Sequence, residues 1–296
     1  MFAVSFRGDG RGLRTASLTA LALVAFAANS LLCRLALRGG EIDAASYTSL
    51  RLLAGAAALW AIIAWLGRPR EAAHGGSWVS AAMLFVYAIA FSFAYFTLEA
   101  GTGALILFGA VQVTMIAAGL KGGERPHTLE WLGLVTAFAG LVYLVFPGLS
   151  APEPLGAVLM ALAGIAWGVY SLRGRGNRDP ARATAANFGR AVPFALIASV
   201  ALWADFDLSA RGVWLAVASG ALASGLGYVM WYAALKGLST SQAATVQLSV
   251  PVLAALGGGL FLAETITLRL LVSTFIILGG VSLALWCGHR PRPVTR

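Results

Sequence analysis

Long apolar runs separated by short polar connections fill this chain, and they constrain its fold more than any other feature. A helix crosses the hydrocarbon core of a bilayer, roughly 30 Å thick, with about 20 apolar residues. Runs of this kind predict ten spans, at about 16–37, 44–66, 77–98, 101–120, 129–146, 155–172, 184–204, 213–235, 242–262 and 268–287. The sequence therefore predicts an all-α membrane protein with ten transmembrane helices.

Composition agrees with this fold class. Mean hydropathy is +0.81, and charged residues make up 11% of the chain, whereas a soluble domain carries about 25%. A water-soluble fold could not cover so much apolar surface. The first apolar run is too long for the core of a secretory signal, so we expect it to remain as a span.

Basic residues in the connections predict the orientation. If the N-terminus is cytoplasmic, fifteen Lys and Arg residues lie on the inner side and four, Arg34, Arg38, Arg211 and Arg269, on the outer side. This asymmetry favours cytoplasmic N- and C-termini in a bacterial inner membrane. It also explains the net charge of +9, because the excess charge then faces anionic lipid, so no nucleic-acid partner is expected.

The two halves of the chain resemble each other weakly. With an offset of 139 residues Arg51 falls on Arg190, and with an offset of 140 Glu124 falls on Glu264. These matches predict two five-helix repeats, 16–146 and 155–287, between cytoplasmic tails at 1–15 and 288–296. Because five is odd, the repeats must be inverted, which suits alternating access around a midplane site.

Four segments carry a resemblance to a known family: VAFAANSLLCRLAL (24–37), SYTSLRLLAG (46–55), GIAWGVYSLRGR (164–175) and SQAATVQLSVPVLAALGGGLFLAETIT (241–267). They resemble the drug/metabolite transporter superfamily of the EamA type. The resemblance implies a ten-helix exporter with a central cavity lined mainly by helices 3, 4, 8 and 9. Within the family, the aromatic content is most similar to bacterial amino-acid exporters of the YddG kind.

Aromatic and amide side chains at membrane depth are candidates for the cavity wall. The candidates are Asn29, Tyr87, Phe91, Tyr95, Gln112, Trp167, Tyr170, Asn187, Tyr228, Trp231, Gln247 and Ser249. An aromatic, weakly polar cavity would suit a neutral or aromatic amino acid or another flat amphiphile. For each residue the competing interpretation is packing between helices or hydrogen bonding across them.

Arg51 and Arg190 are the charges placed well inside spans. Each could contact a substrate carboxylate, or reach the interface and bind helix-end carbonyls, and their distance from the midplane favours the second interpretation. Pro251 and Gly257 predict a hinge in the ninth span, with Gly109 as its counterpart in the fourth. A simple packing kink explains the same residues equally well.

The spans contain no acidic residue or histidine in their interiors. This pattern favours a facilitator or exchanger over a proton-coupled carrier. No cofactor or metal is expected, and the sequence leaves the oligomeric state open, with a monomer among the alternatives. The competing functions are an intramembrane enzyme acting on a lipid-linked substrate, an exporter of drugs, sugars or nucleosides, and a channel. No HExxH or GxSxG motif supports the enzyme.

Overall fold

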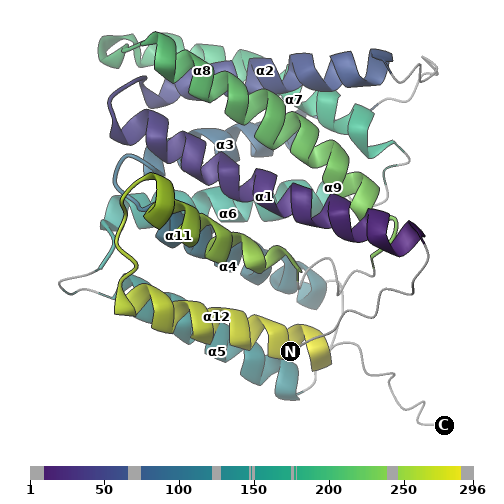
Figure 1. Ribbon diagram of the computed structural model, residues 1–296, viewed down its shortest axis with the longest axis vertical. Coiled ribbons are helices and arrows are strands. Elements are labelled where there is room, and N and C mark those ends of the chain that lie inside the picture. Colours follow the sequence, from purple (N-terminus) through teal and green to yellow (C-terminus); the bar gives the residue numbers. More distant parts are fainter. Residues whose placement is uncertain are drawn as a thin grey trace.

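A computed structural model describes residues 10–65, 75–121, 128–146, 148, 151–174, 177, 179–238 and 246–287. Its helices run roughly along one common direction (Figure 1). They are α1 (Gly10–Arg38), α2 (Ala44–Trp65), α3 (Trp78–Ala94), α4 (Ala100–Lys121), α5 (Thr128–Val145), α6 (Pro154–Gly174), α7 (Pro180–Ala201), η1 (Trp203–Asp205), α8 (Ala210–Ala218), η2 (Ser219–Leu226), α9 (Gly227–Leu235), α11 (Ser249–Phe261) and α12 (Leu268–Cys287).

Six helices in the described part of the chain are long and apolar enough to cross a membrane. One of them is composite, since α8, η2 and α9 follow one another from Ala210 to Leu235. Four shorter apolar helices occupy the remaining predicted spans. The chain is therefore an all-α, multi-pass membrane protein, as its apolar runs predict.

The helix boundaries differ from the predicted spans at several ends. α1 begins at Gly10, inside the predicted tail, and α7 begins at Pro180 rather than at 184. Asp179 explains the earlier start of α7, because its carboxylate accepts a hydrogen bond from the backbone of Arg182 and Pro180 follows it. Residues 288–296 of the predicted C-terminal tail and residues 242–245 of the predicted ninth span lie outside the described residues.

Helices from the two halves of the chain pair with each other. α2 packs against α7, α4 against α11, and α5 against α12, and each pair joins the predicted counterparts of the two repeats. The contact of α3 with α6 is likewise mirrored by the contact of α1 with α8, η2 and α9. Figure 1 shows α5 and α12 along one edge and α2, α7 and α8 along the opposite edge. This is the pairing that a two-fold relation between the halves would produce.

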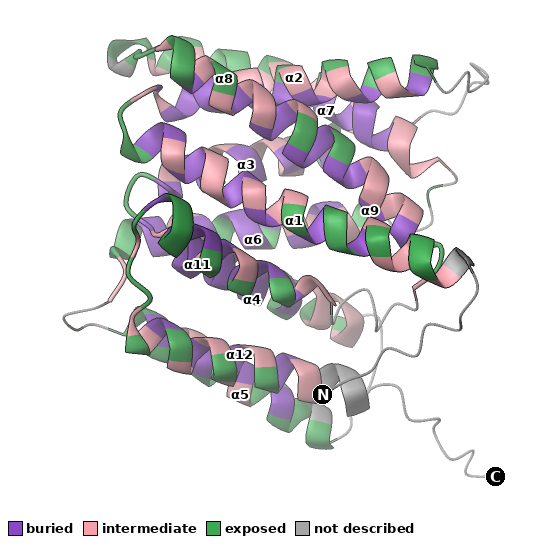
Figure 2. Ribbon diagram, viewed as in Figure 1, coloured by how far each residue is buried: buried purple, intermediate pink, exposed green. Residues whose placement is uncertain are grey.

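Small residues permit the closest of these approaches. A side chain at Gly101 of α4 would collide with Ala255 of α11, and one at Gly220 of η2 would collide with the backbone carbonyl of Arg51 in α2. Large apolar side chains remain exposed, among them Val200, Leu260 and Phe275, and Figure 2 shows exposed positions along the outer helices of the bundle. An apolar exterior over a tightly packed interior is the arrangement expected of helices that face lipid.

Candidate functional site

A central cavity lies between the halves. Its lining residues come from α1, α3, α4, α6, η2 and α9 and from the residues before α11: Phe26, Asn29, Ser30, Tyr87, Phe91, Leu107, Phe108, Trp167, Ala223, Ser224, Tyr228 and Gln247. The cavity measures about 30 Å³, which admits water but no amino acid. Of the predicted cavity residues, the structure brings Asn29, Tyr87, Phe91, Trp167, Tyr228 and Gln247 together here.

Aromatic rings from both halves form a continuous wall of this cavity. The ring centroids of Tyr87 and Trp167 are 4.9 Å apart, and those of Trp167 and Tyr228 are 5.3 Å apart. Tyr87 also contacts Phe91 one helical turn later, at 5.4 Å. Rings at these distances attract one another and present broad faces to a bound solute.

Arg51 lies directly behind this wall. Its residue exposure is 1%, and its Nη2 donates a 2.9 Å hydrogen bond to the Tyr87 hydroxyl. Its guanidinium carbon is 5.2 Å from the Tyr87 ring centroid and 5.0 Å from that of Phe91. The interpretation favoured by the sequence, in which Arg51 reaches the interface or binds helix-end carbonyls, does not describe this geometry.

Most of the hydrogen-bonding capacity of Arg51 is unused. Its Nε and Nη1 have no hydrogen-bond partner, and the ionisable groups facing it are the hydroxyls of Tyr47, Tyr87 and Tyr228 and the thiol of Cys33. None of the ion pairs among the described residues includes Arg51. A buried cation without a counter-ion is costly, because it has lost its hydration and gained little in exchange.

The Tyr87 hydroxyl is the end of a short polar chain. The Ser219 hydroxyl donates to Asn29 Oδ1 over 2.6 Å, and Asn29 Nδ2 donates to Tyr87 Oη over 3.3 Å. Since Tyr87 Oη accepts from both Asn29 and Arg51, both of its lone pairs are occupied. Its own proton remains available as a donor beside the cavity.

A second pocket opens at the end of the bundle that carries Arg190, here called the Arg190 end. It measures about 190 Å³ and is lined by residues that include Ser77, Ser80, Tyr170, Arg173 and Asn187. Asn187 accepts from the Ser77 backbone over 2.9 Å and donates to the Tyr170 hydroxyl over 3.5 Å. Tyr170 and Asn187, predicted for the central cavity, thus line this separate pocket instead.

Arg190 binds a backbone carbonyl, as one of the two interpretations of the sequence expects. Its Nη1 donates to the Gly75 carbonyl over 2.8 Å. This contact holds the segment before α3 against α7. The two arginines related by the repeat therefore have different environments, because only Arg51 has unpartnered buried nitrogens.

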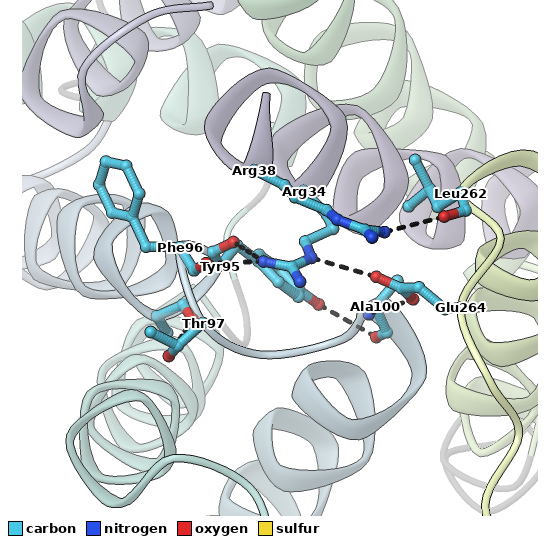
Figure 3. A network of polar contacts seen from close by, with 9 residues as sticks. Arg34, Arg38, Tyr95, Phe96, Thr97, Ala100, Leu262 and Glu264 are labelled. Carbon is cyan, nitrogen blue, oxygen red and sulfur yellow. Dashed lines mark hydrogen bonds and ion pairs between the residues drawn. The ribbon is translucent and has the colours of Figure 1, made fainter. Parts of the chain in front are cut away.

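At the opposite end, here called the Glu264 end, an ion pair links α1 to the segment after α11 (Figure 3). Arg34 Nε lies 3.1 Å from Glu264 Oε1, with both side chains less than a tenth exposed. Arg34 Nη1 also donates to the carbonyls of Tyr95 and Phe96, each over 2.8 Å. Glu264 Oε2 accepts from the backbone of Ala100 over 2.8 Å, at the positive end of α4.

This arrangement, which we call the Arg34 clamp, joins α1, the end of α3, the start of α4 and the segment after α11. Arg38 adds a 2.9 Å hydrogen bond to the Leu262 carbonyl. Burial and the neighbouring Glu264 carboxylate raise the pKa of Glu99, which precedes α4. The sequence predicts Arg34 on the outer side and matches Glu264 with Glu124, but nothing in its spacing links Arg34 to Glu264, 230 residues away.

The remaining predicted residues lie elsewhere. Tyr95 is buried at the Glu264 end, where its hydroxyl donates to the Ala100 carbonyl over 3.3 Å. Trp231 packs with Phe26 at a centroid distance of 5.8 Å, and Gln112 is buried on α4 outside the cavity lining. Ser249 is exposed on α11, so its predicted place in the cavity wall is not where the structure puts it.

The predicted hinge residues have identifiable surroundings. Leu248 is a turn residue with right-handed helical dihedrals (φ −64°, ψ −12°), and α11 begins after it at Ser249, so Pro251 occupies its first turn. A proline is tolerated in a first turn, where the backbone N–H groups lack partners within the helix. Gly257 faces Leu31 of α1, and Gly109 faces Leu141 of α5, each without room for a side chain. Both glycines thus serve close packing, and bending at them stays a prediction.

Comparisons with known proteins agree with this architecture. The family model described as EamA-like transporter family matches residues 154–286. The chain is 54% identical over 272 residues to the uncharacterized protein PA1977 of Pseudomonas aeruginosa, covering 92% of this chain and 94% of that protein. A solved crystal structure with 20% identity has a TM-score of 0.65 and covers 93% of this chain and 99% of its own.

Two further relatives are named as a transporter and an exporter. An uncharacterized transporter of Archaeoglobus fulgidus is 28% identical and covers 82% of this chain and 87% of its own. The threonine/homoserine exporter RhtA of Salmonella typhimurium is 31% identical over 187 residues, 60% of this chain and 61% of its own. These relatives and the family model indicate transmembrane transport of small metabolites. The chain belongs to the EamA-like transporter family of the drug/metabolite transporter superfamily.

Proposed function

We propose that the chain exports neutral or aromatic amino acids, or flat solutes of similar size, across the bacterial inner membrane. The observation that carries the proposal is the central cavity, walled by Tyr87, Trp167 and Tyr228 from both halves of the chain. Such a wall favours a small solute with an apolar portion. The name of the relative RhtA, an exporter of two amino acids, supports the same substrate class.

Transport would proceed by alternating access. The Arg34 clamp links α1, α3, α4 and the segment after α11 at the Glu264 end, and a pocket of about 190 Å³ opens at the Arg190 end. If the basic loops mark the cytoplasm, this conformer faces inward, and export requires the clamp to separate after the solute has entered the cavity. The helical interruption at Leu248, next to the cavity residue Gln247, supports bending at this depth.

The driving force would be the gradient of the solute itself. Arg51 is the charged side chain that touches the aromatic wall, and the carboxylates of Glu41, Glu153 and Glu264 lie near the ends of helices in the described part of the chain. A carrier that moves protons usually keeps a titratable relay at membrane depth.

Counterflow in proteoliposomes tests the proposal. Vesicles containing the full chain are loaded with unlabelled L-threonine, L-homoserine, L-leucine or L-phenylalanine and diluted into a trace of the labelled compound. We expect saturable accumulation of at least one label without an imposed pH gradient. Flux that does not saturate would indicate a channel, and a requirement for a pH gradient would indicate proton coupling. If only labelled sugars or nucleosides accumulated, the proposed class of substrate, amino acids and similar flat solutes, would be wrong.

A further inference from the structure

Arg51 is an unneutralised cation at the wall of the cavity. It is 1% exposed, yet Nε and Nη1 have no hydrogen-bond partner. Its neighbours are neutral phenols and a thiol rather than carboxylates. Buried arginines are ordinarily paired, so this one has the hydrogen-bonding capacity and the charge to receive an anion from outside the protein.

The guanidinium reaches the cavity through two residues. Tyr87 and Phe91 line the cavity on one side and contact the guanidinium on the other. For an anion in the cavity to reach the free nitrogens, one of these two rings would have to turn aside. The Tyr87 hydroxyl, whose lone pairs are both occupied by Asn29 and Arg51, would then donate its proton to the same anion.

We propose that Arg51 and Tyr87 bind the carboxylate of the transported solute. This inference rests on the proposed function and specifies its substrate as a monocarboxylate. The planar fork of a guanidinium matches the two oxygens of a carboxylate. One positive charge fits one negative charge, which disfavours a phosphate dianion. Trp167 and Tyr228 line the same cavity, and their aromatic faces would accept the ammonium group of an amino acid.

Binding requires the cavity to widen. At about 30 Å³ the cavity cannot hold phenylalanine. Ring rotation at Tyr87 and Phe91 would both enlarge the cavity and uncover the guanidinium. Binding of the carboxylate would therefore move the aromatic rings that line the cavity between the two halves of the chain.

Matched acids and amides test the proposal in purified full-length protein. L-phenylalanine, L-phenylalaninamide and 3-phenylpropionate are titrated in a thermal-shift assay against wild-type protein, Arg51→Gln, Arg51→Lys and Arg269→Gln. Arg269 is the matched control, because it stacks over Tyr143 and donates to a backbone carbonyl far from the cavity.

We expect wild-type protein to bind both acids at least tenfold more tightly than the amide. Arg51→Gln should lose this preference, Arg51→Lys should keep part of it, and Arg269→Gln should behave like the wild type. Without ligand, Arg51→Gln should melt at the same or a higher temperature than the wild type, because it removes an unpaired buried charge. A residue that only supports the fold would give a lower melting temperature.

Several results would overturn the proposal: equal binding of acid and amide by the wild type, no binding of either acid, or an acid preference that survives in Arg51→Gln. Counterflow separates this failure from failure of the proposed function. Amino-acid counterflow that persists in Arg51→Gln contradicts the carboxylate site alone. Acid-selective binding without any counterflow contradicts the transport proposal and leaves the site intact.

Discussion

At the scale of single residues, buried polar groups in this chain are stabilised by a few specific contacts. Tyr87 is the clearest example, because its hydroxyl oxygen accepts hydrogen bonds from both Asn29 and Arg51. Removing this hydroxyl would leave the buried Arg51 guanidinium without a hydrogen bond. The consequences of losing a single oxygen atom at Tyr87 and at Tyr95 should therefore differ.

Tyr87→Phe should destabilise the protein by about 1.5–3 kcal/mol, the usual contribution of a hydrogen bond to a charged group. Tyr95→Phe is the matched control, since it loses one 3.3 Å bond to a carbonyl and should cost about 0.5–1.5 kcal/mol. Thermal or denaturant unfolding in detergent measures both. Equal losses for the two variants would argue against the role of Tyr87 as the partner of Arg51.

Glu99 should make stability depend on pH. Because burial and Glu264 raise its pKa in the folded protein, the folded state binds the proton more tightly than the unfolded state. Its favourable contribution is present below the unfolded pKa and is lost as pH rises through the folded pKa. Glu99→Gln should therefore melt at a higher temperature than wild type at neutral pH, with the difference disappearing in acid. A constant difference across pH would contradict this assignment.

At the scale of elements, the apolar runs predict the helices well, and the interruptions within them less well. All ten predicted spans overlap described helices, because length and hydropathy alone decide what can cross a bilayer. The π-helical stretch η2 has no signal in the sequence analysis, since its small residues also fit an α-helix. The helix break before Pro251 follows from the proline itself, which has no N–H to donate to the Gln247 carbonyl, but the sequence does not determine at which residue the helix restarts.

Pro251→Ala should make the interrupted helix more regular. An alanine N–H at this position could bond to the carbonyl of Gln247 and join residues 246–247 to α11. We expect a higher melting temperature and slower counterflow. Pro154→Ala is the control, because Pro154 opens α6 at a position where proline is already favourable. Unchanged counterflow in Pro251→Ala would mean that the interruption plays no part in transport.

At the scale of the whole molecule, the sequence predicts the membrane fold and half of the cavity wall but not the Arg34 clamp. Tyr87 and Phe91, which lie one helical turn apart and are both candidates from the sequence, line the cavity. No local pattern reveals that Arg34 meets Glu264, 230 residues away, since their contact depends on how α1, α4 and α11 are arranged. The same limitation explains why Trp231 and Ser249 were assigned to the cavity.

Glu264→Gln should weaken closure of the Glu264 end. Ser30 lines the cavity, so Ser30→Cys reports access when a membrane-impermeant thiol reagent is added from that side. We expect Glu264→Gln to increase labelling several-fold, because breaking a buried pair costs about 3–5 kcal/mol. Glu41→Gln is the control, since its partner Arg211 is 63% exposed and a pair of this kind contributes about 0.2–1 kcal/mol. Similar labelling in both variants would show that the clamp does not control access.

The π-helical stretch has a further consequence for the symmetry of the molecule. α8, η2 and α9 together run from Ala210 to Leu235, whereas their counterpart α3 runs only from Trp78 to Ala94. Mirror-related conformations built from such unequal halves cannot have the same free energy. A carrier of this kind would rest predominantly on one side of the membrane and show a different half-saturation concentration from each face.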